Sequence, residues 1–150
     1  MRFLLLIGFL TINSLVIKAQ LISYSIHQGD TINVIDKDTL RQGVWRTFWP
    51  GGKLSTEVVY RDNKKQGLEI SWYHNGCVKQ ETYYNNGQLD GPVTFYSKSC
   101  AKEFIENYKN GVKEGLELSY HSNGRIKAEG YYKKGNLDGV YKVYTKTGKF

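Results

Sequence analysis

Two cysteines, Cys77 and Cys100, carry the most reactive side chains in this 150-residue sequence. They are 23 residues apart, far beyond the Cys-x-x-Cys spacing of redox and zinc motifs. An oxidising compartment allows such a pair to form a disulfide, whereas a reducing one keeps two separate thiols. Their chemistry therefore depends on the compartment and on the distance at which the fold holds them.

The three histidines, His27, His74 and His121, are the next candidates for metal binding. The sequence contains no His-x-x-His or Cys-x-x-Cys spacing, and His74 and His121 are 47 residues apart. Solvated turn positions explain these side chains better than ligation does. We therefore predict no metal site and no bound cofactor.

Carboxylates recur at matching positions along the chain, as Glu57, Glu81 and Glu129 do and as Asp90, Glu114 and Asp138 do. An active site needs one asymmetric cluster in a concavity, whereas periodic carboxylates form a ladder. The sequence also lacks a G-x-S-x-G elbow, an H-E-x-x-H pair and a phosphate-binding glycine loop. We predict no catalytic residues and no enzymatic activity.

All of these residues are periodic because the chain itself repeats. A glycine occurs every 24 residues, at positions 43, 67, 91, 115 and 139. Five residues after each glycine comes an aromatic residue, and 17 residues after the first four glycines comes a tyrosine. Two close copies, YYNNGQLDG at 83–91 and YYKKGNLDG at 131–139, show the same period. A fixed period of this length is typical of repeat architectures.

Each repeat reads as a β-hairpin. Asn-Gly pairs at 75–76, 86–87, 110–111 and 123–124 supply the positive φ that two-residue hairpin turns require. Odd offsets from the leading glycine gather most of the apolar residues, as Leu68, Ile70, Val78 and Tyr84 show, which predicts strands with one buried face. The predicted fold is all-β, an elongated antiparallel meander of stacked 24-residue β-hairpin repeats that forms a single-layer twisted ribbon.

The chain divides into three parts. Residues 1–19 have a positive start, an apolar run and a small residue at Ala19, and they are predicted to be a signal peptide, with a single membrane anchor as the alternative. Residues 20–42 form a predicted N-terminal capping hairpin. Residues 43–150 form the array, with units 43–66, 67–90, 91–114, 115–138 and a partial unit 139–150. The signal peptide predicts export to the periplasm, the cell envelope or the medium.

The phrases YYNNGQLDG and YKNGVKEG, each followed by an aromatic strand, resemble the MORN repeat, particularly its bacterial variant. The resemblance covers residues 43–150 and implies a hairpin stack used for attachment to a protein partner or to lipid. Some bacterial members are labelled antitoxin components. The third repeat departs from the pattern, because Cys100 replaces a turn glycine and Phe95 and Ile105 occupy even offsets. We expect irregular pleating there.

The repeat sets the distance between the cysteines. Cys77 and Cys100 lie at the same hairpin corner of successive repeats. Equivalent corners are separated by about 10 Å, whereas bridged Cα atoms lie within about 7 Å, so a bridge requires the two loops to lean together. We predict a disulfide over two separate thiols, because an exported protein is oxidised and the third repeat gives up its turn glycine here.

Surface residues remain as the basis of function. Trp45, Tyr83, Tyr131 and Tyr141 occupy even offsets, where they form either a binding platform or a simple amphipathic cover. The net charge of +7 is scattered along the sequence, which disfavours nucleic acid. The sequence predicts an exported, non-enzymatic protein that binds another macromolecule, a protein first of all. The alternatives are a cell-wall glycan, anionic lipid, or an antitoxin-like role beside a toxin.

Overall fold

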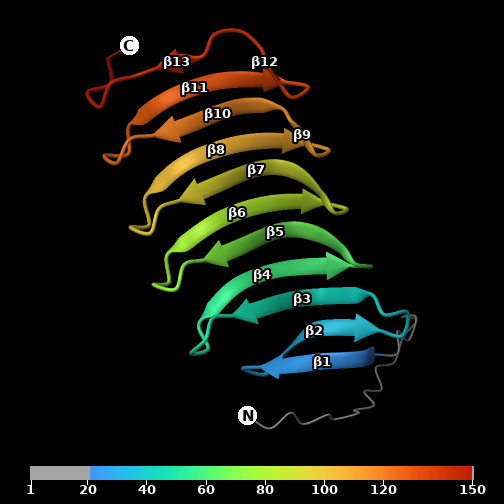
Figure 1. The fold of residues 1–150 in the computed structure, drawn as a ribbon. Coiled ribbons are helices and arrows are strands. Elements are labelled where there is room, and N and C mark those ends of the chain that lie inside the picture. Colours follow the sequence, from blue (N-terminus) through green and yellow to red (C-terminus); the bar gives the residue numbers. More distant parts are fainter. Residues whose placement is uncertain (1–20, 150) are drawn as a thin grey trace.

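The computed structural model describes residues 21–149, which form one antiparallel sheet of 13 strands (Figure 1). The first eight strands, β10, β11 and β12 follow one another in sequence order across the sheet, β9 pairs with β8 and β13 pairs with β11. These residues contain no helix, and hence no helix that could cross a bilayer. The predicted fold class is confirmed.

The strands have the following bounds: β1 Leu21–His27, β2 Asp30–Asp36, β3 Arg41–Phe48, β4 Leu54–Arg61, β5 Lys64–Trp72, β6 Val78–Asn85, β7 Gln88–Tyr96, β8 Lys102–Lys109, β9 Val112–Lys113, β10 Gly115–Tyr120, β11 Ile126–Lys133, β12 Asn136–Leu137 and β13 Lys142–Val143. The turns fall on two edges of the ribbon (Figure 1). We call the loops within the repeats, at the left in Figure 1, the corners (48–55, 72–79, 96–103, 120–127 and 144–149). The turns that join successive repeats, at the right, are the tips (60–67, 84–91, 108–115 and 132–139).

The tips are two-residue turns with positive φ at both positions. Asn86 and Gly87 have φ of 52° and 86°, and Asn110 and Gly111 have 49° and 79°. An Asn-Gly pair tolerates this geometry better than other residues, so the prediction holds at 86–87 and 110–111. The residue before each repeat's leading glycine then accepts a tip N–H, as Gln66 does from Asn86 at 3.0 Å.

The corners are built differently, and the prediction for 75–76 and 123–124 was wrong. Only the glycines have positive φ there, 92° at Gly76 and 81° at Gly124. The N–H of Gly76 donates to the carbonyl of Tyr73 at 2.9 Å, and the side chain of Asn75 accepts from the N–H of Cys77 at 3.1 Å. The corner is thus a four-residue turn closed by a glycine, with asparagine in a side-chain role.

A bulge at each of the first four corners also changes which residues share a face. Ser71 pairs with Gln80 but Trp72 pairs with Val78, so Lys79 is an extra residue without a direct partner. An extra residue moves all later side chains of a strand to the opposite face. Leu68 therefore lies opposite Tyr83 and not beside Tyr84. The expectation that odd offsets share one face through the whole repeat was wrong for this reason.

The register defines a buried face and an exposed face. The buried face carries Val58, Thr82, Val93, Glu117 and Ala128, which are all at most 6% exposed. It shares its residues across neighbouring strands, since Thr82 pairs with Val93. The opposite face carries Leu68 and Tyr83, and we call it the exposed face. Thr94 is a buried residue on this face. A sheet of one layer thus keeps its small core on one side.

The third repeat is regular, contrary to the expectation from its sequence. Strands β7 and β8 pair from Gly91 opposite Tyr108 to Phe95 opposite Phe104, with the same corner bulge as the other repeats. The rings of Phe95 and Phe104 lie 6.2 Å apart on the buried face. Even offsets before the bulge lie on the buried face, which places Phe95 there, and even offsets after it lie on the exposed face, where Ile105 pairs with Thr94.

The N-terminal hairpin of β1 and β2 joins the array through side chains as well as backbone. The amide of Asn33 replaces a strand partner for Arg46, since it donates to the carbonyl at 3.1 Å and accepts from the N–H at 2.7 Å. Asp36 accepts from Gln42 and from two loop N–H groups. Hydrogen bonding from Gln42 in particular lowers the pKa of Asp36. The signal segment 1–19 lies outside the described residues.

Candidate interaction surface

The exposed face carries a lengthwise apolar row at the tip side of the strand centres. It comprises Val59, Leu68, Tyr83, Pro92, Leu116 and Tyr131. Tyr83 is 40% exposed, Leu116 41% and Tyr131 49%. Each tyrosine lies opposite a leucine on the same face, Tyr83 opposite Leu68 and Tyr131 opposite Leu116. These pairs are two repeats apart, about 20 Å along the ribbon.

A leading glycine holds one of these tyrosines in place. Gly91 has φ of +129°, a conformation that residues with a Cβ rarely adopt. A Cβ there would lie 3.0 Å from the Cβ of Tyr83. Gly91 therefore serves two purposes, because it permits the backbone bend and leaves room for Tyr83 to lie across the start of the next repeat.

The other two predicted aromatics, Trp45 and Tyr141, lie on the opposite face, so the four do not form one platform. Trp45 pairs with buried Val58 and donates its indole N–H to the carbonyl of Gln42 at 3.2 Å. Tyr141 packs on Gly130, where a Cβ would lie 2.6 Å from its ring. The corner bulge, absent from a simple offset count, explains the separation.

The buried face alternates between charged and apolar layers. Two residues before the leading glycines stand Lys65 and Lys113, each with a glutamate four residues later. Lys65 bonds Glu69 at 2.6 Å and lies over the ring of Tyr84 at 4.8 Å. In the third repeat these two positions hold Leu89 and Val93. In the first repeat Arg41 has no glutamate four residues later and lies instead over the ring of Trp45, at 4.7 Å from the ring centre.

Lys113 is the most enclosed of these cations. Its Nζ contacts Glu106 and Glu117 and lies 4.0 Å from the ring centre of Tyr132. Burial alone would lower the pKa of Lys113, but hydrogen bonds to the two glutamates outweigh it and raise that pKa. Glu117 is only 6% exposed, so this cluster is a structural ion pair within the sheet and not a reactive centre.

The glutamates of the exposed face form hydrogen bonds between successive strands. Tyr96 donates to Glu81 at 2.9 Å, and Tyr144 donates to Glu129 at 2.8 Å. Burial first, and then the bond to Glu81, raises the pKa of Tyr96 to about 12. Asp90 and Glu114 accept N–H groups at the tips. The periodic carboxylates therefore hydrogen-bond successive strands and turns to one another.

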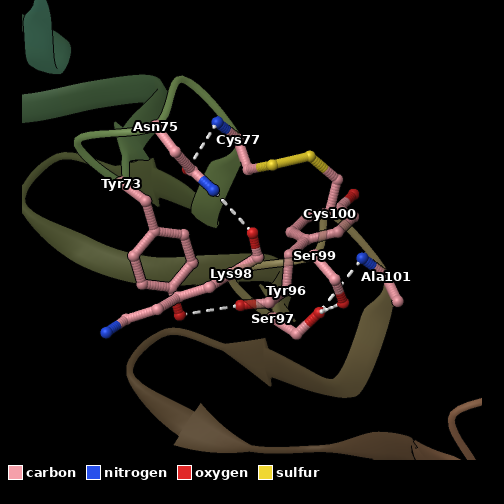
Figure 2. The surroundings of a disulfide bond; sticks show 9 residues. All are labelled: Tyr73, Asn75, Cys77, Tyr96, Ser97, Lys98, Ser99, Cys100 and Ala101. Carbon is pink, nitrogen blue, oxygen red and sulfur yellow. Dashed lines mark hydrogen bonds between the residues drawn. A yellow bond between two sulfur atoms is a disulfide. The ribbon is translucent and has the colours of Figure 1, made fainter.

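At the corner edge the structure joins Cys77 and Cys100 in a disulfide, with Cα atoms 5.1 Å apart (Figure 2). The same two loops share two hydrogen bonds, from the Tyr73 hydroxyl to the Tyr96 carbonyl at 2.9 Å and from the Asn75 amide to the Lys98 carbonyl at 2.7 Å. All three links join residues 23 positions apart. Equivalent residues are 24 apart, so this one-residue offset brings the loops together. Cys100 occupies a position with φ of 63°, where the other corners have glycine.

Two open hollows lie at the same repeat position along this edge. One of about 340 Å³ is lined by Gly76, Cys77, Val78, Tyr96 and Cys100. The other, of about 510 Å³, is lined by Gly124, Arg125, Ile126, Glu129, Tyr144 and Gly148. The disulfide closes one side of the smaller hollow, whereas Arg125 borders the larger one.

The histidines have structural neighbours. His27 packs against Phe48 with ring centres 4.6 Å apart, His74 meets the edge of Trp49, and His121 bonds the carbonyl of Tyr144 at 2.8 Å. Within residues 21–149 no three His, Cys, Asp or Glu side chains are grouped so that they could hold a metal. The prediction that the chain has no metal site and no cofactor rests on the sequence alone.

The geometry defines a repeat protein made of stacked β-hairpins with one exposed face. The MORN repeat variant model matches residues 41–62, 65–86 and 113–134. The chain is therefore a MORN-variant repeat protein, and such repeats commonly bind proteins or membrane lipids and are generally not enzymes. Each matched segment starts at Arg41, Lys65 or Lys113, where the third repeat has Leu89. No curated protein matched the sequence.

Proposed function

We propose that this is an exported, non-enzymatic protein that binds a protein partner along its exposed face. The observation that carries the proposal is the apolar row, in which Tyr83, Leu116 and Tyr131 are each at least 40% exposed. Tyrosine is enriched at protein interfaces because its ring offers a large apolar area and its hydroxyl a hydrogen bond. The disulfide and the sequence of residues 1–19 support export.

The register of the strands gives the tyrosines of the row neighbouring residues in the unbound protein. Tyr83 lies beside Gly91 and Tyr131 lies opposite Leu116, so each tyrosine has a neighbouring residue on the sheet in the unbound protein. Ordered side chains lose less conformational entropy on binding. Between these two tyrosine–leucine pairs the third repeat has Pro92 opposite Asn107, so the two pairs are separate anchor points.

Crosslinking of the mature protein in its native envelope tests the proposal. The variant Tyr83→Ala/Tyr131→Ala should lose the crosslinked protein partner, whereas Tyr141→Ala/Val143→Ala on the other face should retain it. Melting curves of both variants show whether the fold is preserved. Retention of the same partner by the first variant would contradict a role for this face.

Other outcomes distinguish the alternatives. Co-sedimentation with purified cell-wall glycan that requires Tyr83 and Tyr131 would make the row a sugar platform. Flotation with anionic vesicles would favour a membrane role. Recovery of an exported toxin as the partner would support the antitoxin-like function that the family resemblance implies.

A further inference from the structure

Cations that are scattered in the sequence gather at one edge of the folded ribbon. The corners contain eight lysines and arginines and one acid, Glu103. The cations are Lys53, Lys79, Lys98, Lys102, Arg125, Lys127, Lys146 and Lys149. All eight are exposed, and within the described structure none of them forms an ion pair.

The opposite edge differs in charge. The tips carry seven cations and four acids, Asp62, Asp90, Glu114 and Asp138. Two of those cations, Lys65 and Lys113, are neutralised on the buried face. The unbalanced positive charge of the array therefore lies mainly along the corner edge, which is at the left in Figure 1.

The corner cations form a line. Successive corners are about 10 Å apart, and five corners span about 40 Å. This spacing equals the Debye length of about 10 Å at 0.1 M salt, so neighbouring corners act on one ligand together. Links between the loops, such as the disulfide and the bond from His121 to the Tyr144 carbonyl, hold parts of the line in place before binding.

We propose that the corner edge is a second binding surface, separate from the exposed face, for a linear anionic polysaccharide. A chain with a carboxylate on its sugars presents regularly spaced negative charge along one line, which a single row of cations can follow. A nucleic acid duplex carries one charge per about 1.7 Å and calls for a denser basic track. Single strands further require exposed rings that stack on bases, and Trp49 is the only exposed Trp, Tyr or Phe among the described corner residues.

The corner edge also lacks what a protein interface needs. Its exposed large hydrophobic side chains are only Trp49 and Ile126 among the described residues, at 38% and 37%. Interface cores between proteins are apolar, so a polyanion fits this edge better than a folded partner does. The hollow bordered by Arg125, Glu129 and Tyr144 offers polar groups and a ring for a sugar unit.

Binding of the full mature protein to polygalacturonate, with its methyl-esterified form as the uncharged control, tests the proposal. Affinity should fall steeply between about 50 and 200 mM salt, and the esterified polymer should bind at least about tenfold more weakly. The corner variant Lys98→Gln/Lys102→Gln/Lys127→Gln should bind at least about tenfold more weakly than the parent. The tip variant Lys64→Gln/Lys109→Gln/Lys133→Gln removes the same charge and should change affinity by less than about threefold.

Three results would overturn the proposal. Equal losses in the corner and tip variants would mean that net charge alone drives binding. The absence of binding to polygalacturonate at low salt would exclude the ligand class. Tighter, corner-dependent binding to single-stranded DNA or to anionic vesicles would assign the edge to another polyanion. Unchanged thermal melting of both variants is the control for folding.

Discussion

The two edges of the ribbon share one period but are stacked by different chemistry. At every tip a side chain before the leading glycine accepts an N–H of the turn, as Gln66, Asp90 and Glu114 do. At three corner joints the residue six positions after the leading glycine donates to a carbonyl of the next corner, as Trp49, Tyr73 and His121 do, but only one joint also has a disulfide. The tips therefore share one hydrogen-bond pattern, whereas the corners differ in covalent linkage, and most of the unpaired positive charge lies at the corners. A repeat protein can vary one edge because the other keeps its register.

The corner joints themselves range from covalent to unlinked. The second and third corners share the disulfide and two hydrogen bonds. In the third corner Ser97 and Ser99 bond each other at 2.8 Å, and no described side chain links residues 96–103 to residues 120–127. At the corner edge the disulfide thus fastens the third repeat on one side only, whereas nearer the tips the bond from Asn107 to the Leu116 carbonyl also joins the third repeat to the fourth.

The largest expected effect comes from breaking the covalent joint. The variant Cys77→Ser/Cys100→Ser should lower the free energy of unfolding by about 3 kcal/mol, because the bridge closes a loop of about two dozen residues in the unfolded chain. Urea denaturation of the oxidised parent and the variant measures this. Mass analysis of unreduced protein that finds two free thiols would contradict the bridge itself.

A related variant sharpens the role of Cys100. Cys77→Ser/Cys100→Gly should be more stable than the double serine variant by about 1 kcal/mol, because glycine adopts the φ of 63° at position 100 at little cost. The same denaturation experiment compares the two. Equal stability would mean that the backbone relaxes once the bridge is gone.

A tip glycine should give the next largest effect. Gly91→Ala should cost about 2 kcal/mol, because the new Cβ would meet Tyr83 in a backbone conformation that disfavours side chains. Gly43→Ala is the matched control, since φ there is +68° and nothing lies within 4 Å of the added Cβ. Its cost should be about 1 kcal/mol. Equal costs in a thermal melt would remove Tyr83 from the explanation.

A single corner hydrogen bond should matter less. Tyr73→Phe removes the bond to the Tyr96 carbonyl and should cost about 1 kcal/mol. In the Cys77→Ser/Cys100→Ser background the same change should cost less, because loops no longer held together make the bond only part of the time. A double-mutant cycle measures this coupling, and strict additivity would argue against it.

The smallest expected effect is on the stability of the protein at low pH. Hydrogen bonds from Tyr144 and Lys142 lower the pKa of Glu129 below its ordinary 4.5. Its contribution to stability is therefore present above pH 4.5 and is lost as the pH falls through the folded pKa. As the pH falls through this range, the free energy of unfolding of Glu129→Gln should decrease less than that of the parent. Urea denaturation at several pH values measures this. Glu103→Gln, at an exposed corner position, should behave like the parent.

The sequence by itself determined the repeat, its hairpins and the tips. Glycine every 24 residues and Asn-Gly pairs at 86–87 and 110–111 act locally, through φ preferences that no distant contact needs to supply. The family likeness carried by YYNNGQLDG was visible at the same level. The prediction that no reactive cluster exists also rested on spacing alone.

Only the tertiary structure decided which side chains share a surface. One extra residue at each of the first four corners, such as Lys79, reverses the faces, so Tyr83 and Tyr131 separate from Trp45 and Tyr141. Stacking likewise gathers the scattered lysines on one edge and brings Cys77 within 5.1 Å of Cys100. Face and edge depend on register across strands, and a count along one strand cannot supply that register.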